Sequence, residues 1–245
     1  MCTDCGCGLP EHQHHAHPEI VDVMTPLLAE NDRVAAHNRE HFDRAGVLAI
    51  NLMSSPGAGK TALLEATIER LGGECRIAVV EGDLETENDA VRIRRLGVPA
   101  VQICTTTTCH LDATMLHRAL HELDLAEIDL LFVENVGNLV CPASFDLGQH
   151  LNVTLLSTTE GDDKPAKYPV MFRAADLVLI SKSDLIEVLD DFDVAAATEA
   201  LRGLGSSATV LETAARRAVA VEPWLNWLRA RLSDRRSQKP VAVAE

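Results

Sequence analysis

Residues 54–61, which read SSPGAGKT, constrain the fold of this 245-residue chain more than any other stretch. The pattern closes with the Gly-Lys-Thr of a phosphate-binding P-loop, and Ser54 stands where the first glycine is usual. The apolar run at 47–53 suits a buried strand, and residues 62–71 have the periodicity of an amphipathic helix. A strand, a small-residue loop and a helix in this order predict a nucleotide-binding site rather than a glycine turn with a chance lysine.

The residue types in this loop are those that a phosphate-binding loop requires. Small residues let backbone N–H groups point at phosphate oxygens, and the following helix offers its positive end. Lys60 would reach the β- and γ-phosphates, and the Thr61 hydroxyl would hold Mg²⁺. The expected nucleotide-binding residues here are Ser55, Gly57, Ala58, Gly59, Lys60 and Thr61.

Further apolar runs indicate buried strands at 76–81, 100–104, 128–133, 153–157 and 176–180. Helical patterns lie between several of these runs, and one more surrounds Trp224 and Trp227. This order predicts an α/β fold of the P-loop NTPase class, a mostly parallel sheet flanked by helices. We divide the chain into a flexible Cys/His-rich metal-binding tail at 1–17, one or two helices at 18–44, a P-loop GTPase domain at 45–232 and a flexible tail at 233–245.

Charge and composition exclude several classes of function. The formal net charge of −15 argues against nucleic acid or an anionic membrane as a partner, because phosphate groups attract basic surfaces. There is no signal peptide and no run of about eighteen apolar residues, so we expect a cytoplasmic protein. The seven cysteines are therefore expected as thiols or metal ligands, with Cys75 and Cys104 as ordinary buried residues.

The first seventeen residues contain Cys2, Cys5 and Cys7 and lack apolar periodicity. The C-x-x-C spacing lets two sulfurs bind one nickel, zinc or copper ion, and a redox dithiol is the alternative. The same segment holds histidines that either add metal ligands or form a solvated polar tail: His12, His14, His15 and His17. Further on, His37 and His41 have helical spacing that can hold a metal, but no third ligand is in view and a solvated face is the alternative.

Acidic residues follow two of the predicted strands, where the carboxyl ends of parallel strands open onto the nucleotide. Asp83 and Asp89 could hold Mg²⁺ or position the attacking water, and a helix N-cap with an acidic first turn is the alternative. Glu134 ends an apolar strand where P-loop proteins place the acid that supports Mg²⁺, and Gly137 would offer its N–H to the γ-phosphate. The expected catalytic residues are Lys60, Asp83 and Glu134, with Thr61 and Asp83 at magnesium.

Three candidate ligands for nickel or zinc lie in loops after predicted strands. Cys109 and His110 follow a threonine-rich loop, and Cys141 lies seven residues past Glu134. Each of them alone would more often be a buried thiol or a hydrogen-bonded histidine. Together they predict a metal site near groups that respond to the γ-phosphate, which offers a physical link between nucleotide state and metal affinity.

Residues 181–184 follow a late strand, where guanine-nucleotide proteins carry N-K-x-D. Asp184 would accept hydrogen bonds from the guanine N1–H and amino group, while the stem of Lys182 packs on the ring. Ser181 stands in place of the asparagine. The residues therefore favour GTP and GDP as the ligands of this site.

These motifs together resemble the HypB family, the nickel-insertion GTPases of [NiFe]-hydrogenase maturation, over nearly the whole chain. The segments that carry the resemblance are CTDCGC at 2–7, the P-loop at 54–61, EGD at 81–83, CHLDA at 109–113, ENVGNL at 134–139 and GDDKP at 161–165. The resemblance implies the fold of the dimerising P-loop GTPases and a GTP-driven homodimer. It also implies nickel sites at Cys109, His110 and Cys141 and, separately, at the three cysteines of the tail. The implied partners are a HypA-like accessory protein and the hydrogenase large-subunit precursor.

The chain departs from the family pattern in three places. Ser181 replaces an asparagine, which removes one expected guanine contact, and Gln149 stands where an acid is commoner. Residues 211–217, LETAARR, replace the expected second base-contacting loop. The related urease GTPase UreG has a Cys-Pro-His metal motif, whereas Ala143 follows Cys141 and Pro142 here.

The function predicted from these residues is GTP hydrolysis coupled to nickel delivery, with metal affinity and dimerisation set by the nucleotide. One alternative is a nickel or zinc storage protein with a weak NTPase activity. Another is a P-loop kinase that phosphorylates a small molecule, although kinases lack the base-reading pair of Lys182 and Asp184.

Overall fold

The computed structural model describes residues 18–83, 88–105, 109–189 and 191–237, with side chains described from Leu27 onward. The tail predictions at Cys2, Cys5, Cys7 and the nearby histidines lie outside the described residues. No helix in the described ranges is long and apolar enough to cross a membrane.

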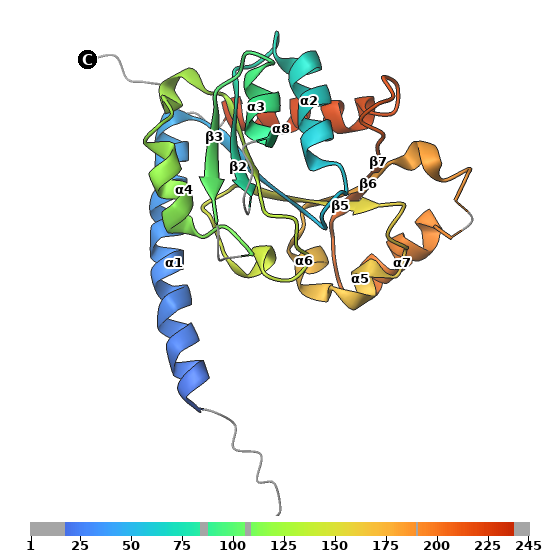
Figure 1. Ribbon diagram of the computed structural model, residues 1–245, viewed down its shortest axis with the longest axis horizontal. Coiled ribbons are helices and arrows are strands. Elements are labelled where there is room, and N and C mark those ends of the chain that lie inside the picture. The colour runs from blue at the N-terminus through green and yellow to red at the C-terminus, as the bar shows by residue number, and fades with distance from the viewer. Residues whose placement is uncertain (1–17, 84–87, 106–108, 190, 238–245) are drawn as a thin grey trace, which may run out of the picture.

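The described chain forms one seven-stranded parallel sheet in the order β3-β2-β4-β1-β5-β6-β7 (Figure 1). The strands are β1 Leu48–Ser54, β2 Ile77–Asp83, β3 Ala100–Cys104, β4 Leu130–Glu134, β5 Leu151–Ser157, β6 Leu177–Ser181 and β7 Thr209–Glu212. The predicted α/β class and parallel sheet are confirmed. Because all strands run the same way, their carboxyl ends share one edge, which is where the candidate site residues lie.

Helices cover both faces of the sheet, with α2, α3 and α8 on one face and α1, α4, α6 and α7 on the other (Figure 1). Their bounds are α1 Pro18–Ala45, α2 Lys60–Leu71, α3 Asn88–Arg94, α4 Ala113–Leu120, α5 Lys164–Lys167, α6 Pro169–Ala174, α7 Val194–Gly203 and α8 Glu222–Ser237. Short 3₁₀ turns are η1 Leu125–Glu127, η2 Pro142–Ser144 and η3 Ser183–Leu185.

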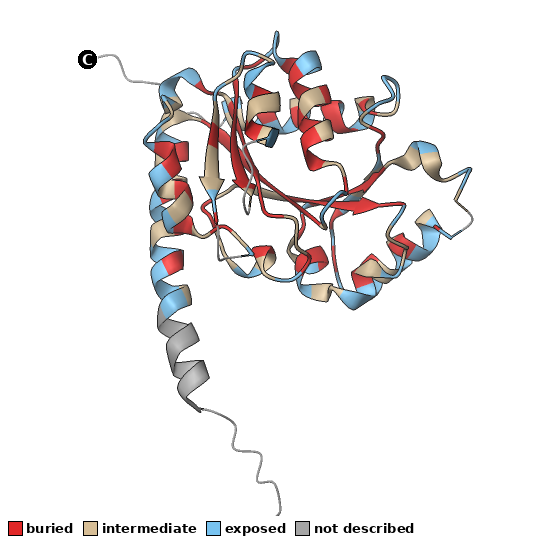
Figure 2. Cartoon of the chain, viewed as in Figure 1, coloured by how far each residue is buried: buried red, intermediate tan, exposed pale blue. Residues whose placement is uncertain are grey.

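The central strands are buried on both faces, as their continuous apolar sequences predict (Figure 2). Ile50 of β1 packs towards α2 and α8, whereas Ala49 packs towards α1 and α4. Trp224 of α8 is fully buried 6.2 Å from the ring of Phe132 in β4. This double-sided core holds the strand ends rigidly beneath the site.

Helix α1 is a single helix of 28 residues where one or two helices were expected. It ends before Gly46, whose φ of 71° is the left-handed conformation that suits a helix end. Two buried asparagines join α1 to its neighbours. Asn31 accepts from Ala113 N and donates to Asp146 O, each at 2.9 Å, and Asn38 donates to Ala113 O and Leu147 O. Helix α1 therefore fixes the start of α4 and the segment before β5.

Several sequence expectations need correction. Cys104 is exposed rather than buried, because it ends the edge strand β3. The boundary expected at Ser233 falls inside α8, which continues to Ser237 because Arg235 donates to Val47 O and pairs with Asp43 at 2.6 Å. No element was predicted at β7, α5, α6 or α7.

Candidate nucleotide and metal site

The P-loop joins β1 to α2, and its backbone requires glycine at two positions. Gly57 and Gly59 have φ values of 74° and 101°, in the left-handed region that side chains other than glycine rarely adopt. A Cβ at either position would meet no atom within 4 Å, so the constraint is backbone conformation rather than space. The loop thus depends on glycine for its backbone conformation, as a phosphate cradle does.

Lys60 and Thr61 both interact with Glu134 across the loop. The Lys60 ammonium donates to Ser54 Oγ at 3.1 Å and lies 4.0 Å from Glu134 Oε1, and the Thr61 hydroxyl donates to the same oxygen at 3.0 Å. All of these groups are buried, so their charges interact through a medium of low polarisability. The structure therefore brings together two of the three predicted catalytic residues, Lys60 and Glu134, with the predicted magnesium ligand Thr61.

Glu81 is a buried acid that sequence reasoning did not assign to the site. It is the register partner of Glu134 in the neighbouring strand. Burial first, then repulsion from Glu134, raises the pKa of Glu81 well above its usual range, and a hydrogen bond between the two carboxyl groups raises it further. Glu81 is therefore the protonated donor, and the Glu134 carboxylate is the acceptor.

The paired acids fit a divalent cation. Glu81 Oε1 and Glu134 Oε2 are buried without a hydrogen-bond partner among the described residues. Oxygen atoms from carboxylates and hydroxyls are the ligands that Mg²⁺ prefers. Thr61, Asp83 and Glu134 line the same pocket, so the residues present match the expected ion.

This phosphate-side pocket has a volume of about 460 Å³, within the range of small-ligand sites. Asp83, at the end of β2, lines it together with Asp89 and Gly137. A Cβ on Gly137 would lie 2.9 Å from Cα of Pro56, so the loop after β4 packs directly on the P-loop backbone. The predicted nucleotide and magnesium residues of this region thus line one pocket.

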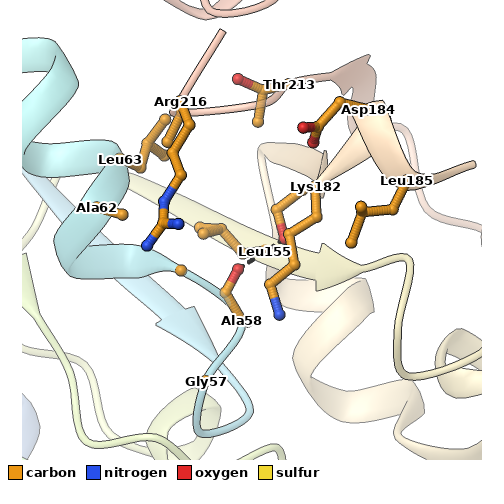
Figure 3. A pocket seen from close by; sticks show the side chains of 13 residues that line it. Gly57, Ala58, Ala62, Leu63, Leu155, Lys182, Asp184, Leu185, Thr213 and Arg216 are labelled. Carbon is orange, nitrogen blue, oxygen red and sulfur yellow. Dashed lines mark hydrogen bonds between the residues drawn. The ribbon is translucent and has the colours of Figure 1, made fainter.

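A second pocket of about 460 Å³ begins where the P-loop ends (Figure 3). Lys182 and Asp184 line it, as a base-binding pair would, and Lys182 has an unusual φ of 56°. Ser181 is directed to the P-loop, where its hydroxyl donates to Ala58 O at 2.7 Å. The serine that stands here in place of asparagine therefore links the end of β6 to the P-loop.

The segment that replaced the expected second base loop also lines this pocket. Thr213, Ala215 and Arg216 face it, and Arg216 borders both pockets. In Figure 3 the side chains of Arg216 and Lys182 reach towards Ala58 from opposite sides. Sequence reasoning missed Arg216, because its segment carries no motif. The one feature that could have identified Arg216 was its position after β7, at the carboxyl ends of the strands. That feature was not available from the sequence, because β7 was not predicted.

Cys109, His110 and Cys141 meet in space, although Cys141 is far from the other two in sequence. Their ligand atoms all lie within 4.8 Å of one another. The Cys109 thiol donates to Cys141 Sγ at 3.0 Å, and His110 Nδ1 is 4.0 Å from Cys109 Sγ. The His110 ring stacks on Phe145 at a centroid distance of 3.9 Å, which restricts its orientation. Two thiols and one imidazole form a donor set suited to nickel or zinc.

Two of the three residues of the triad, Cys141 and His110, have pKa shifts that favour their neutral forms. The hydrogen bond with Cys109, burial and repulsion from that thiol together raise the pKa of Cys141. Burial lowers the pKa of His110, which leaves a lone pair on the ring. A bound metal ion would have to displace thiol protons, so metal affinity should rise with pH.

A short chain of contacts joins the triad to the P-loop. Asn138 donates through its side chain to Cys109 O at 3.4 Å, and the adjacent Gly137 packs on Pro56. Asn135 accepts from Leu111 N at 3.3 Å and donates to Asn51 of β1 at 3.2 Å. The segment after β4 therefore touches both the metal triad and the phosphate cradle.

The chain is similar to known proteins over most of its length. The family model described as CobW/HypB/UreG, nucleotide-binding domain, matches residues 48–212. Hydrogenase maturation factor HypB of Azotobacter vinelandii is 50% identical over 227 residues, which cover 89% of this chain and 75% of that protein. The crystal structure of HypB from Helicobacter pylori in complex with nickel aligns with a TM-score of 0.80 at 40% identity, covering 88% of this chain and 100% of the other. HypB from Archaeoglobus fulgidus aligns with a TM-score of 0.78 at 41% identity, covering 84% of this chain and 100% of the other.

Proposed function

This chain belongs to the CobW/HypB/UreG family, among the hydrogenase maturation factors HypB, and we propose that it is a GTP-hydrolysing nickel metallochaperone for [NiFe]-hydrogenase. Nickel is its cargo, with zinc as a competing ion. The proposed working form is a homodimer whose assembly depends on the nucleotide. Its proposed partners are a HypA-like accessory protein and the hydrogenase large-subunit precursor.

The observation that carries this proposal is the contact chain from the triad to the P-loop. Cys109 is hydrogen-bonded by Asn138, and the neighbouring Gly137 lies against Pro56 of the loop. A γ-phosphate bound by the Gly137 N–H would shift this segment and, with it, the spacing between Cys109 and Cys141. Nucleotide state would then change metal affinity.

The proposed chemistry is water attack on the γ-phosphate. Lys60 would stabilise the charge that develops on the phosphate oxygens, because it is held in place by Ser54 and Glu134. Asp83 would orient the attacking water from the end of β2. When bound, Mg²⁺ would neutralise phosphate charge, held by Thr61 and Asp83 with Glu134 in support. No strong general base is apparent among the described pocket residues, so we expect slow turnover.

The proposed choice of base depends on Asp184, which lies in the second pocket with Lys182. A carboxylate accepts two hydrogen bonds from guanine but has no donor for the acceptors of xanthine. Asp184→Asn should therefore weaken GTP binding and strengthen binding of xanthosine triphosphate. Unchanged relative affinities for the two nucleotides would contradict guanine recognition by this residue.

The central test is nickel titration of the full chain with a non-hydrolysable GTP analogue and with GDP. The tail cysteines are replaced by serine to remove the tail site, and the internal site is identified as the nickel binding that Cys141→Ala removes. We expect the two affinities to differ by about 5- to 150-fold, the usual range of allosteric coupling. Cys141→Ala should abolish this site. Equal affinities with both nucleotides, or an unchanged titration for Cys141→Ala, would contradict the proposal.

Lys60→Ala provides the matched control for the nucleotide part of the test. This variant should lose the difference between the GTP-analogue and GDP titrations while it keeps the triad intact. If Lys60→Ala still delivers nickel to the hydrogenase precursor as well as the unaltered chain does, the protein acts as a nickel store and the P-loop is not its switch.

A further inference from the structure

Four histidines form a cluster between α1 and α4, the two helices that lie side by side in Figure 1. His37 and His41 come from α1, His117 comes from α4, and His121 caps the C-terminus of α4. Each pair has the i, i+4 spacing that places two rings on one face of a helix. The two faces meet, with centroid distances of 5.2 Å between His37 and His117 and 5.9 Å between His41 and His117.

Three of these histidines converge on one point. The ligand nitrogens of His37, His41 and His117 all lie within 4.8 Å of one another, and the Nε2 atoms of His37 and His41 are 3.0 Å apart. Metal–nitrogen bonds of about 2.0–2.1 Å separate neighbouring ligand nitrogens by about 3.0–3.4 Å. Only small side-chain movements would therefore close the three rings around one ion.

The orientation of His117 is set by a buried neighbour. Asn38 donates through Nδ2 to Ala113 O and Leu147 O, so its Oδ1 must face the ring of His117. Oδ1 lies 2.9 Å from His117 Nδ1, which therefore carries the proton and donates it. The lone pair of His117 is consequently on Nε2. A carbonyl oxygen that fixes the tautomer of a histidine is the usual second layer of a metal site.

We propose that His37, His41 and His117 bind one divalent transition-metal ion that favours imidazole, of the class of Ni²⁺, Zn²⁺ or Cu²⁺. Hard cations such as Mg²⁺ do not suit the cluster, because they prefer oxygen ligands. The site is separate from the Cys109 triad, since its donors are all nitrogen and come from different elements. It also supplies the third ligand that the spacing of His37 and His41 lacked in the sequence.

Two of the three rings, those of His41 and His117, lie in surroundings that disfavour a positive charge. Burial first, and then repulsion from neighbouring histidines, lowers the pKa of both His41 and His117. The crowding of these imidazoles therefore disfavours their positively charged form. The competing explanation is that the histidines only pack α1 against α4, in which case no metal ion would bind them.

The test uses Ni²⁺ alone as the probe and the full-length chain. The cysteines at 2, 5, 7, 109 and 141 are replaced by serine or alanine, and the tail histidines by glutamine, so that the other candidate sites are removed. This background should bind one equivalent of Ni²⁺, measured by calorimetry, and the ion should raise its thermal midpoint. A background that binds no Ni²⁺ would overturn the proposal.

Single substitutions then identify the ligands. His37→Gln, His41→Gln and His117→Gln should each weaken Ni²⁺ binding by at least about tenfold, as loss of a ligand does. His121→Gln is the matched control, because it removes an exposed histidine from the same cluster but outside the ligand set. Equal weakening by His121→Gln, or full affinity in the other three variants, would overturn the ligand assignment. His37 is itself exposed, so its variant keeps the test decisive if His117→Gln fails to fold.

Discussion

Glu81 shows at the scale of one residue how burial changes acid–base chemistry. Its carboxyl group is buried beside Glu134, and only one of the two acids can be charged without strong repulsion. The proton on Glu81 is therefore part of the nucleotide-free structure. Its counterpart Glu134 keeps the negative charge that faces Lys60 and Thr61.

This arrangement predicts that Glu81→Gln stabilises the protein free of nucleotide and metal. The folded-state pKa lies above the ordinary value of 4.5, so the unfolded chain loses this proton at lower pH than the folded one. The free energy of unfolding should therefore fall as pH rises above 4.5, and glutamine removes this loss. At pH 8 we expect a gain of about 1–3 kcal/mol, with a much smaller gain at pH 5.

Urea unfolding in the presence of a chelator measures this effect at both pH values. Glu69→Gln, an exposed acid on α2, is the control and should change neither value. A Glu81→Gln protein that is less stable at pH 8 than the unaltered chain would contradict a protonated Glu81.

Gly137 is a residue whose role follows from its close packing against the backbone of Pro56. A side chain there would press on the Pro56 backbone, which cannot move aside without distorting the P-loop. Gly137→Ala should therefore weaken nucleotide binding by about tenfold or more, which corresponds to about 1.4 kcal/mol. Fluorescent-nucleotide titration measures this loss.

Gly203→Ala is the matched control, since a Cβ there meets nothing within 4 Å. It lies at the end of α7 and should leave nucleotide affinity unchanged while it raises stability by up to about 1 kcal/mol. Equal affinity in the Gly137 and Gly203 variants would show that the loop after β4 does not constrain the P-loop.

The residues of the site differ in how far sequence alone could identify them. The P-loop was predictable because it is local, and its demand for glycine is a property of the backbone. The position of Glu81 beside Glu134 depends on strand order, and the meeting of His117 with His37 depends on how α4 packs on α1. Such contacts are properties of the fold and have no local signature.

At the scale of elements, hydrophobic runs predicted strands β1 to β6, including the edge strand β3, and missed only β7 among the described strands. β1, β4 and β6 are fully buried and have continuous apolar sequences. β7 is half-exposed at the end of the sheet, so its sequence alternates too weakly to be recognised. The short α5 was missed because it has proline and lysine where longer helices show apolar periodicity.

Arg76 and Asp129 form a linked pair of charged residues immediately before strands β2 and β4. The Arg76 guanidinium and backbone N–H both donate to Asp129, at 3.0 and 2.9 Å, and the guanidinium bonds hold the pKa of that acid at about 2. Burial opposes this shift but is outweighed. The pair fixes where the two strands start relative to each other.

Asp129→Asn should therefore lower the free energy of unfolding by about 1–2 kcal/mol at pH 7, after allowance for partial exposure. The pKa is depressed in the folded state, so this stability is present above about pH 4 and is lost as pH falls towards 2. Denaturant unfolding of both proteins between pH 7 and pH 3 should show their difference shrinking. Glu127→Gln, which removes a mostly exposed partner of Arg76, should cost less than about 0.5 kcal/mol.

At the scale of the whole molecule, one end of the sheet carries the candidate functional site, and the other end carries contacts that join helices of the two faces. The carboxyl ends of the strands carry both pockets and the triad. At the opposite end, Asp43 of α1 pairs with Arg235 of α8 and with His150 before β5. His150 also accepts a hydrogen bond from Ala49 N at 3.0 Å. Helices from the two faces are thus joined around the amino ends of the central strands.

The contacts of Arg235 with α1 and β1 predict different results for two truncations of the chain. Ending the chain after Leu232 removes Arg235 and should lower the free energy of unfolding by about 1–2 kcal/mol, the usual value of a charged hydrogen bond. Ending it after Ser237 keeps the contacts of Arg235 with Asp43 and Val47. Thermal unfolding distinguishes the two proteins, and equal midpoints would mean that residues 233–237 contribute nothing to the fold.

Helix α1 can also be considered as a mechanical element. Its buried Asn31 and Asn38 are bonded to Ala113, just after His110, and to residues 146–147, shortly after Cys141. Each of the two asparagines bonds to both segments, so the same helix joins them. Helix α1 therefore sets the distance between the segment that follows His110 and the segment that follows Cys141, and with it the spacing of the triad.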